Sequence, residues 1–391
     1  MKRLALATVA AMLTMAYAGS AIAGSSAAGA SRALYRVTDV KVPAGMQNLM
    51  VAGMNGSSDL VATAYFHQRS VVLLALDAGA MGSRLVALSP PQGFTNISAV
   101  GIDSAGAIAV NAWRSAAFYA PFVVTDQGGT FTWTRLPVTG SAKISYQLAG
   151  MAANGDVAGT KAPNNPSSSR AVVWHMTSTG GYMVASPLPL NRGYGHSVAS
   201  AIWSQGSREL VGGEESASKL SSDRITIWSP RPVQSSRLHG QLAQMFLTRP
   251  PVSIGGWGNH LYLAGRLMGV DTGNGWNARV RVGLNGVATP GAFAPLPYPK
   301  YQGAECFYGA NGVTAGADGK FVGVGSVSCI ASKRPAEALL WRSASVTPLQ
   351  SLVQNKAGWQ LQDAQTINTR GQIAGTGRFM GGNAVFVLTP A

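Results

Sequence analysis

Residues Gln362–Gly377, which read QDAQTINTRGQIAGTG, decide the fold. An apolar segment ends at Ile367–Asn368, a polar turn follows at Thr369–Gly371, and a second apolar run starts at Gln372. Two short runs around Asn and Gly, the residues that most readily tolerate positive φ, are typical of a β-hairpin. We therefore expect two antiparallel strands here.

The same hairpin recurs along the whole chain. The first strongly apolar residue after each turn marks seven copies, namely Leu60, Ile108, Val157, Leu210, Leu263, Phe321 and Ile373. These markers are spaced 48 to 58 residues apart. A period of about fifty residues is in the range of propeller blades or solenoid units.

Each hairpin is followed by a third apolar run, and most copies show a fourth. The third runs are residues 71–76, 120–125, 171–176, 224–229, 278–283, 337–342 and 384–389. Each unit thus reads as four short strands, A to D, without a helix, whereas a solenoid would use shorter units or helices. The sequence predicts an all-β, seven-bladed propeller of four-stranded antiparallel blades.

The two ends of the repeat array complement each other. The seventh unit shows no fourth strand, whereas an additional strand, residues 34–42, precedes the first hairpin. We expect this N-terminal strand to become the outer strand of the last blade and to close the ring, because an open edge favours aggregation. A β-sandwich or a pair of stacked sheets remains the alternative.

The C-terminal unit resembles the extracellular HAF-repeat proteins, whose units read roughly A-x-x-I-N-x-x-G-Q-I-x-G followed by an A-F-x-[LW] strand. The matching residues are Ala364, Ile367, Asn368, Gly371, Gln372, Ile373, Gly375 and Ala384, followed by Phe386 and Leu388. The extra Val385 interrupts the A-F pair. The other six units are degenerate, and their best remnants are Asn154–Gly155, Trp174, Trp228 and Trp341. The resemblance implies an exported propeller-like protein without an assigned activity, and it brings no catalytic residues.

The N-terminal residues 1–23 read as a secretory signal peptide. Lys2 and Arg3 precede an apolar stretch, and Ala21–Ala23 is a small-residue cleavage site. An uncleaved membrane anchor is the alternative. Residues 24–32 form a flexible linker, and residues 33–391 form one propeller domain. The later chain has no run of eighteen apolar residues, so we predict a secreted or periplasmic protein that is not transmembrane after cleavage.

The chain is strongly basic, with 30 Lys and Arg against 15 Asp and Glu. Removal of Lys2 and Arg3 with the signal peptide lowers the formal charge from +15 to +13. The basic residues are scattered, which argues against a nucleic-acid interface. They either maintain solubility or attract an anionic glycan or envelope surface.

Residues suited to catalysis or metal binding are few. The five His show no metal-ligand spacing, and two Cys are too few for a zinc site. His175 reads as a core or edge residue, and Ser197 lacks the context of a nucleophile elbow. We interpret Glu214–Glu215 as a solvated loop. Three aspartates in equivalent turns read as turn residues, namely Asp103, Asp156 and Asp318. We therefore predict no catalytic residues, no metal and no cofactor.

A binding face follows from strand direction. Strands that run alternately up and down bring the B–C and D–A loops to one face and the A–B turns to the other. Several loops of the first face are long, and function concentrates on long loops of a rigid scaffold. The candidate binding residues there are Tyr194, His196, Asp271, Asn274, Trp276, Tyr298, Tyr301 and Glu305. The alternative is that these residues belong to ordinary surface loops without a binding role.

Cys306 and Cys329, the two cysteines of the chain, flank the hairpin of the sixth unit. Their midpoint falls inside the turn at residues 316–319, so a regular hairpin would place them opposite each other. Since an exported protein meets an oxidising compartment, we predict a disulfide between strands A and B of this blade.

These observations predict a monomeric, non-enzymatic binding or scaffold propeller of the cell envelope or extracellular space. The alternative is an enzyme that acts on an extracellular polysaccharide or another polymer through the long-loop face.

Overall fold

The computed structural model describes most of the chain from Leu34 onward. The described residues are 34–115, 118–140, 144–162, 168–216, 224–230, 233–237, 253–257, 260–266, 275–282, 288–297, 306–329 and 335–391. The predicted signal peptide and linker lie outside this part and stay predictions. No helix among the described residues is long and apolar enough to cross a membrane.

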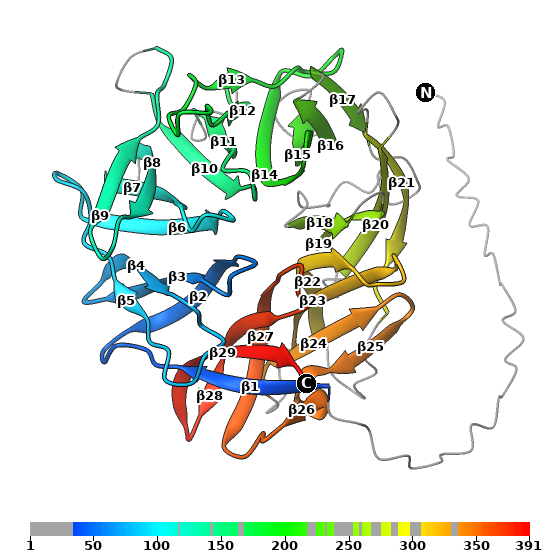
Figure 1. Cartoon of the computed structure of the whole chain (residues 1–391). Coiled ribbons are helices and arrows are strands. Elements are labelled where there is room, and N and C mark those ends of the chain that lie inside the picture. Colours follow the sequence, from blue (N-terminus) through cyan, green and yellow to red (C-terminus); the bar gives the residue numbers. More distant parts are fainter. Residues whose placement is uncertain are drawn as a thin grey trace, which may run out of the picture. The chain divides into compact units, whose positions relative to one another are not determined.

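Seven small antiparallel sheets form a ring (Figure 1). Blade 1 contains β2 (Gln47–Met54), β3 (Leu60–Phe66), β4 (Arg69–Ala75) and β5 (Val86–Ala87). Blade 2 contains β6 (Asn96–Ile102), β7 (Ile108–Ser115), β8 (Phe118–Asp126) and β9 (Phe131–Arg135). Blade 3 contains β10 (Tyr146–Met151), β11 (Val157–Lys161), β12 (Arg170–Trp174) and β13 (Ser186–Pro187). Blade 4 contains β14 (His196–Gln205), β15 (Arg208–Ser216), β16 (Arg224–Pro230) and β17 (Val233–Arg237).

Blade 5 contains β18 (Ser253–Trp257), β19 (His260–Arg266), β20 (Gly275–Val282) and β21 (Ala288–Pro295). Blade 6 contains β22 (Cys306–Ala315), β23 (Phe321–Cys329), β24 (Glu337–Arg342) and β25 (Ser345–Pro348). Blade 7 contains β27 (Trp359–Ile367), β28 (Ile373–Phe379) and β29 (Gly382–Pro390), to which β1 (Tyr35–Val40) and the short β26 (Val353–Gln354) are added. The prediction of a seven-bladed all-β propeller is confirmed.

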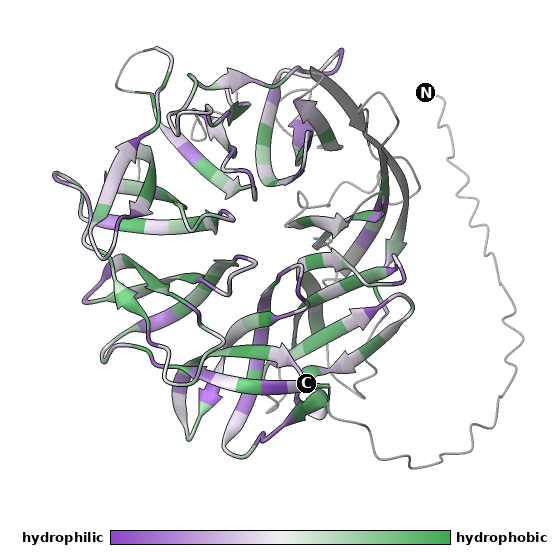
Figure 2. Ribbon diagram, viewed as in Figure 1, coloured by the Kyte–Doolittle hydropathy of each residue, from purple (hydrophilic) through white to green (hydrophobic). Residues whose placement is uncertain are grey.

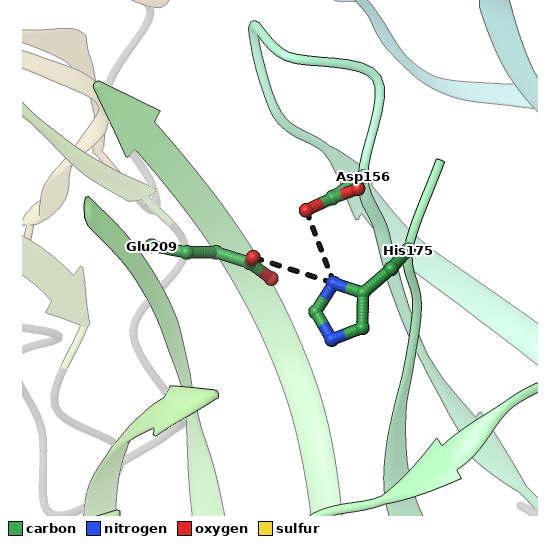
Figure 3. Close-up of side chains that lie close together, drawn as sticks. All are labelled: Asp156, His175 and Glu209. Atoms are coloured by element: carbon green, nitrogen blue, oxygen red, sulfur yellow. Dashed lines mark hydrogen bonds and ion pairs between the residues drawn. The ribbon is translucent and has the colours of Figure 1, made fainter. Parts of the chain in front are cut away.

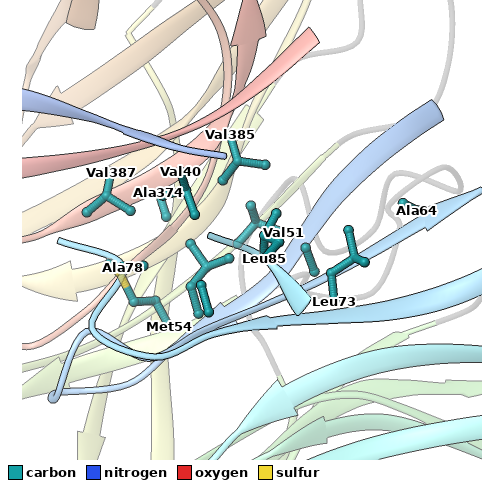
Figure 4. Close-up of a cluster of buried hydrophobic side chains, with 13 residues drawn as sticks. Val40, Val51, Met54, Ala64, Leu73, Ala78, Leu85, Ala374, Val385 and Val387 are labelled. Carbon is teal, nitrogen blue, oxygen red and sulfur yellow. The ribbon is translucent and has the colours of Figure 1, made fainter. Parts of the chain in front are cut away.

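The N-terminal strand closes the ring as predicted. β1 pairs antiparallel with β29, from Tyr35 opposite Pro390 to Val40 opposite Val385. β26 then covers the outer edge of β1. Figure 4 shows the side chains behind this closure, where Val40 and Val385 pack with Met54 of the first blade in one buried cluster. The closure therefore joins the two ends of the chain by a ladder and by a shared core.

The innermost strand of six blades carries a β-bulge at the same place. The register shifts lie between residues 51/53, 99/101, 148/150, 199/201, 310/312 and 364/366. In four blades the residue after the bulge is glycine, and a Cβ added at Gly101 would lie 2.9 Å from the backbone nitrogen of Met151 in the next blade. The absent side chain thus lets neighbouring inner strands approach closely.

Tryptophans of the third strand link blades 3, 4 and 6 to the preceding blade. The indole Nε1 of Trp174 donates to the carbonyl of Pro137 at 2.8 Å, and Trp228 and Trp341 donate in the same way to Pro189 and Pro297. All three indoles are fully buried. Because an indole N–H must find an acceptor when buried, the repeated Trp explains part of the blade-to-blade packing.

In blades 1, 2 and 7 the A–B turn is capped by the side chain of its first residue. Asn368 Oδ1 accepts the N–H groups of Arg370 and Gln372, and its Nδ2 donates to the carbonyl of Asn55 in the next blade. Asn55 makes the equivalent cap and donates to the carbonyl of Asp103. Gly371 has φ +75°, which L side chains rarely adopt. The Asn and Gly of the repeat thus build turns and link neighbouring blades.

Outer strands are shorter than the sequence suggests. The predicted fourth strand of blade 3, residues 182–190, shrinks to β13. Figure 2 shows hydrophobic and hydrophilic residues interspersed along the strands of the blades. Pro187 and Pro189 lack the N–H that a ladder needs, so pairing ends quickly.

The predicted disulfide is present. Cys306 and Cys329 are directly opposed in the β22–β23 ladder, with Cα atoms 3.9 Å apart. The route to this register differs from the regular hairpin assumed above. The turn is centred on residue 318, between Ala315 and Phe321, and the bulge next to Gly312 shifts the register by one residue. The two departures cancel, so the cysteines still meet.

Candidate functional site

A central cavity of about 600 Å³ is lined by the inner strands of all seven blades and by the A–B turns of blades 1, 2, 3 and 7. In six blades the residue skipped by the bulge lines it, namely Ala52, Val100, Ala149, Ser200, Asn311 and Gln365. The bulges bend each inner strand and turn one additional residue toward this cavity. The fold therefore generates a channel at the A–B-turn end of the propeller.

The channel is polar but carries little charge. Among the described residues that line it, the titratable side chains are Asp103 and Arg370. Asp103 Oδ1 accepts the N–H groups of Ala105 and Ala107. Burial raises the pKa of Asp103, against the opposing effect of these backbone hydrogen bonds. Arg370 is exposed in the turn of blade 7.

Amide side chains in the channel are held in fixed orientations. Asn311 Nδ2 donates to Asp363 Oδ1 at 2.8 Å, and Gln365 Nε2 donates to Asp363 Oδ2 at 3.1 Å. Gln365 Oε1 in turn accepts the N–H of Val51 at 2.7 Å. One network therefore crosses blades 6, 7 and 1 and presets the polar groups of this wall.

A second cluster joins blades 3 and 4 (Figure 3). Asp156 precedes β11, His175 follows β12, and Glu209 lies in β15. His175 Nδ1 lies 3.1 Å from Asp156 Oδ2 and 3.5 Å from Glu209 Oε2. The two carboxyl groups are almost fully buried, whereas 13% of the His175 side chain is exposed. An imidazole thus faces two buried carboxyl groups from adjacent blades.

The surroundings favour negative charge on Asp156. Burial alone would raise the pKa of Asp156, but hydrogen bonds from His175, Glu209 and the N–H of Met176 lower it to about 2. Nearby, the Tyr182 hydroxyl donates to the carbonyl of Gly155 at 3.0 Å. Burial, and then the charges of Asp103 and Asp156, raise the pKa of Tyr182 well above its usual value. The neutral phenol is therefore the stable form beside this carboxylate.

The cluster replaces a neutral pair of the repeat. In blade 3, Val157 pairs with Trp174, and in blade 7, Ile373 pairs with Leu388. Asp156 and His175 therefore occupy the positions of Gln372 and Thr389, which lie 3.5 Å apart between their polar side-chain atoms. Sequence reasoning interpreted Asp156 and His175 separately and did not connect them, since one lies in a turn and the other follows a strand.

The predicted long-loop residues are described only in part. Tyr194 and His196 lie together at the start of β14, the end opposite the A–B turn, and neither lines the channel. The side chain of Trp276 in β20 lies outside the described residues, as do Asp271, Asn274, Tyr298, Tyr301 and Glu305. The predicted binding face stays a prediction.

The interpretation of Glu214–Glu215 as a solvated loop is wrong. Both residues lie in β15, and Glu215 is fully buried. Its carboxylate accepts hydrogen bonds from the backbone and side-chain nitrogens of Asn191 and from Thr226 Oγ1. Glu215 thus holds the D–A loop that leads into blade 4.

No protein-family model and no curated protein matches the chain. Among solved structures, polysaccharide lyase Uly1 is 8% identical, with 92% of this chain and 98% of that chain covered and a TM-score of 0.48. A mutant of AofleA from Arthrobotrys oligospora is 10% identical, with 82% and 88% covered and a TM-score of 0.41. A subtype N11 neuraminidase-like protein from a flat-faced bat isolate is 8% identical, with 91% and 94% covered and a TM-score of 0.41. The class of the chain, a seven-bladed β-propeller, rests on its own sheet topology, and no function follows from these similarities.

Proposed function

We propose that the protein is an exported, non-enzymatic propeller that binds an anionic glycan of the cell envelope or extracellular space in its central channel. The observation that carries the proposal is the channel itself. Its volume of about 600 Å³ is in the range of ligand sites, and hydrogen bonds between blades fix polar side chains such as Asn311 and Gln365. Export follows from the predicted signal peptide and agrees with the resemblance to HAF-repeat proteins, to which we assign the chain as part of this proposal.

The chemistry of the lining favours binding over catalysis. Acid–base or nucleophilic catalysis needs titratable groups that converge on one reacting atom. The described lining offers Asp103 from blade 2 and Arg370 from blade 7. The Asp103 carboxylate already accepts hydrogen bonds from the backbone of its own turn. Amides and hydroxyls are better suited to hold a ligand than to transform it.

The same lining suits a saccharide. Sugars present hydroxyl groups to amide and hydroxyl side chains and an apolar ring face to an aromatic ring. The channel offers amides such as Gln365, hydroxyls such as Thr314 and the indole of Trp203. Exposed Arg370 at the turn and the overall positive charge favour an anionic form of the ligand.

A binding screen of glycans and envelope polymers on the purified mature protein tests this proposal. We expect binding of acidic polysaccharides that weakens as ionic strength rises. Arg370→Ala should reduce affinity about two- to fivefold, as removal of one exposed charge contact does. Arg378→Ala is the matched control, because Arg378 is exposed on β28 and does not line the channel. Equal losses in both variants, or no bound polymer at all, would contradict the proposal.

An enzyme that acts on an extracellular polymer through the long-loop face is the second candidate. It is favoured by His196, an acid–base side chain at the start of β14 whose buried Nδ1 has no hydrogen-bond partner among the described residues. Release of reducing ends or unsaturated products from a bound polymer, lost in His196→Ala, would identify this activity. A stable, unmodified polymer after prolonged incubation would exclude it for the polymers tested.

A further inference from the structure

The Asp156–His175–Glu209 cluster combines one imidazole and two carboxylates, side chains that bind divalent transition metals through nitrogen and oxygen. One ligand atom from each side chain lies within 4.8 Å of the other two. We propose that these residues bind one divalent first-row transition-metal ion, with Zn²⁺ as the type case, and that the ion joins blade 3 to blade 4. This site is separate from the central channel, and the proposal does not depend on a glycan ligand.

The distances from His175 to the two carboxylates fit a shared ion. Zinc bonds to imidazole nitrogen and carboxylate oxygen are about 2.0–2.2 Å long. Two such ligands lie about 3.0 Å apart at a right angle and about 3.4 Å apart at the tetrahedral angle. The imidazole Nδ1 lies 3.1 Å from the Asp156 oxygen and 3.5 Å from the Glu209 oxygen. Both separations are those that a common metal ion requires.

The charges also favour a cation. Asp156 and Glu209 are 1% and 3% exposed, and buried charges are normally paired or bound to metals. A protonated His175 neutralises only one of the two carboxylates. A divalent ion would balance both carboxylates at once.

Outer contacts hold the first ligand in place. Asp156 Oδ1 accepts the N–H of Met176 at 2.7 Å, and Oδ2 accepts Asn154 Nδ2 at 3.1 Å. Such second-layer hydrogen bonds orient metal-binding carboxylates. His175 is the partly exposed member of the cluster, so it gives an ion a route from solvent. Three protein ligands leave one tetrahedral position for water.

Metal titration of the chelator-treated mature protein tests the site. Isothermal titration calorimetry with ZnCl₂ should show one ion per chain, lost in His175→Ala and in Glu209→Gln. At a free zinc concentration about 100 times the dissociation constant, the melting temperature of the wild type should rise by about 3–4 °C. Mg²⁺ should have no effect, because it demands an octahedral oxygen shell.

Two controls keep the test decisive. His67→Asn removes an exposed histidine on another blade and should retain the full zinc response. Glu209→Gln preserves side-chain size, so circular dichroism of this variant separates loss of a ligand from loss of fold. A wild type that binds no zinc, or zinc binding that survives both cluster variants, overturns the proposal. Lower stability of the variants without any zinc response of the wild type would identify an ion-pair link between blades instead.

Discussion

Blades 3 and 7 have the same turn and the same ladder but differ in chemistry at two positions. In blade 7, Gln372 is held by Ser58 and Asn368 and faces Thr389. In blade 3, the matching residues Asp156 and His175 form an ionisable pair, to which blade 4 adds Glu209. The ladder registers are alike. The residues of the repeat therefore set the backbone conformation. The side chains at these two positions can differ, neutral in blade 7 and ionisable in blade 3, without a change in the ladder.

The largest expected loss of stability comes from opening the ring to which both blades belong. Deletion of residues 35–40 removes the six ladder pairs between β1 and β29 and exposes the edge of blade 7. We expect aggregation or loss of the cooperative thermal transition. Size-exclusion chromatography and a thermal melt check this outcome, with deletion of residues 24–32 as the control. A monomeric truncated protein with an unchanged melting temperature would show that β1 does not close the ring.

The next effect concerns the glycines of the second strand. A Cβ at Gly213 would collide with the carbonyl of Val198 and the ring of Trp228. Gly213→Ala should therefore cost about 3 kcal/mol of unfolding free energy. Gly56→Ala is the control, because a Cβ there meets one atom at 4.0 Å. Equal denaturation midpoints for the two variants would mean that the close packing of inner strands is not needed.

Trp174→Leu converts blade 3 to the residue that blade 7 carries at Leu388. The change empties part of a buried site and leaves the Pro137 carbonyl without the indole donor. We expect a loss of about 2 kcal/mol, measured by chemical denaturation. A stability equal to that of the wild type would indicate that the Trp and Leu blades are packed equivalently.

The features found from sequence are those that repeat. One hairpin per blade marks the period, and Asn–Gly turns mark each hairpin, so the blade number, the closing strand and the disulfide were predicted correctly. The bulge next to Gly312 leaves no distinct pattern in the sequence. Its glycine is needed for the close approach of the neighbouring blade and not for the conformation of its own strand. The outer strands were predicted too long, since pairing depends on N–H groups that Pro187 and Pro189 lack.

The cluster between blades 3 and 4 escaped prediction for a different reason. Its residues come from a turn, a strand end and the next blade, so their separation along the chain carries no metal-ligand spacing. One signal was present: Asp156 and Glu209 each directly precede a repeat marker, Val157 and Leu210. Adjacent blades bring these equivalent positions together. The long-loop residues lie mostly outside the described chain, so the binding face predicted from them stays open to test.

The smallest expected effect is an increase in the free energy of unfolding, caused by a substitution at Asp103. Asn55 and Asn368 donate from Nδ2 to the next turn, whereas the matching residue in blade 2 is Asp103, a carboxylate that cannot donate when ionised. Burial raises the pKa of Asp103, so the folded state binds the proton more tightly and stability falls as pH rises from about 4 through the raised pKa. Asp103→Asn should add about 0.5–1 kcal/mol at pH 7 and nothing at pH 3. Urea denaturation at both pH values measures it, and a gain that is equal at pH 3 would contradict the charge effect.

The most direct test of the account transplants the pair of blade 7 into blade 3. The double variant Asp156→Gln/His175→Thr should fold and melt cooperatively, with an unfolding free energy within about 2 kcal/mol of the metal-free wild type, because a neutral pair often replaces a buried ionic one at little cost. It should lose the rise in melting temperature on addition of Zn²⁺. A variant that fails to fold, or one that keeps the zinc response, would contradict the claim that these two positions carry chemistry on an interchangeable framework.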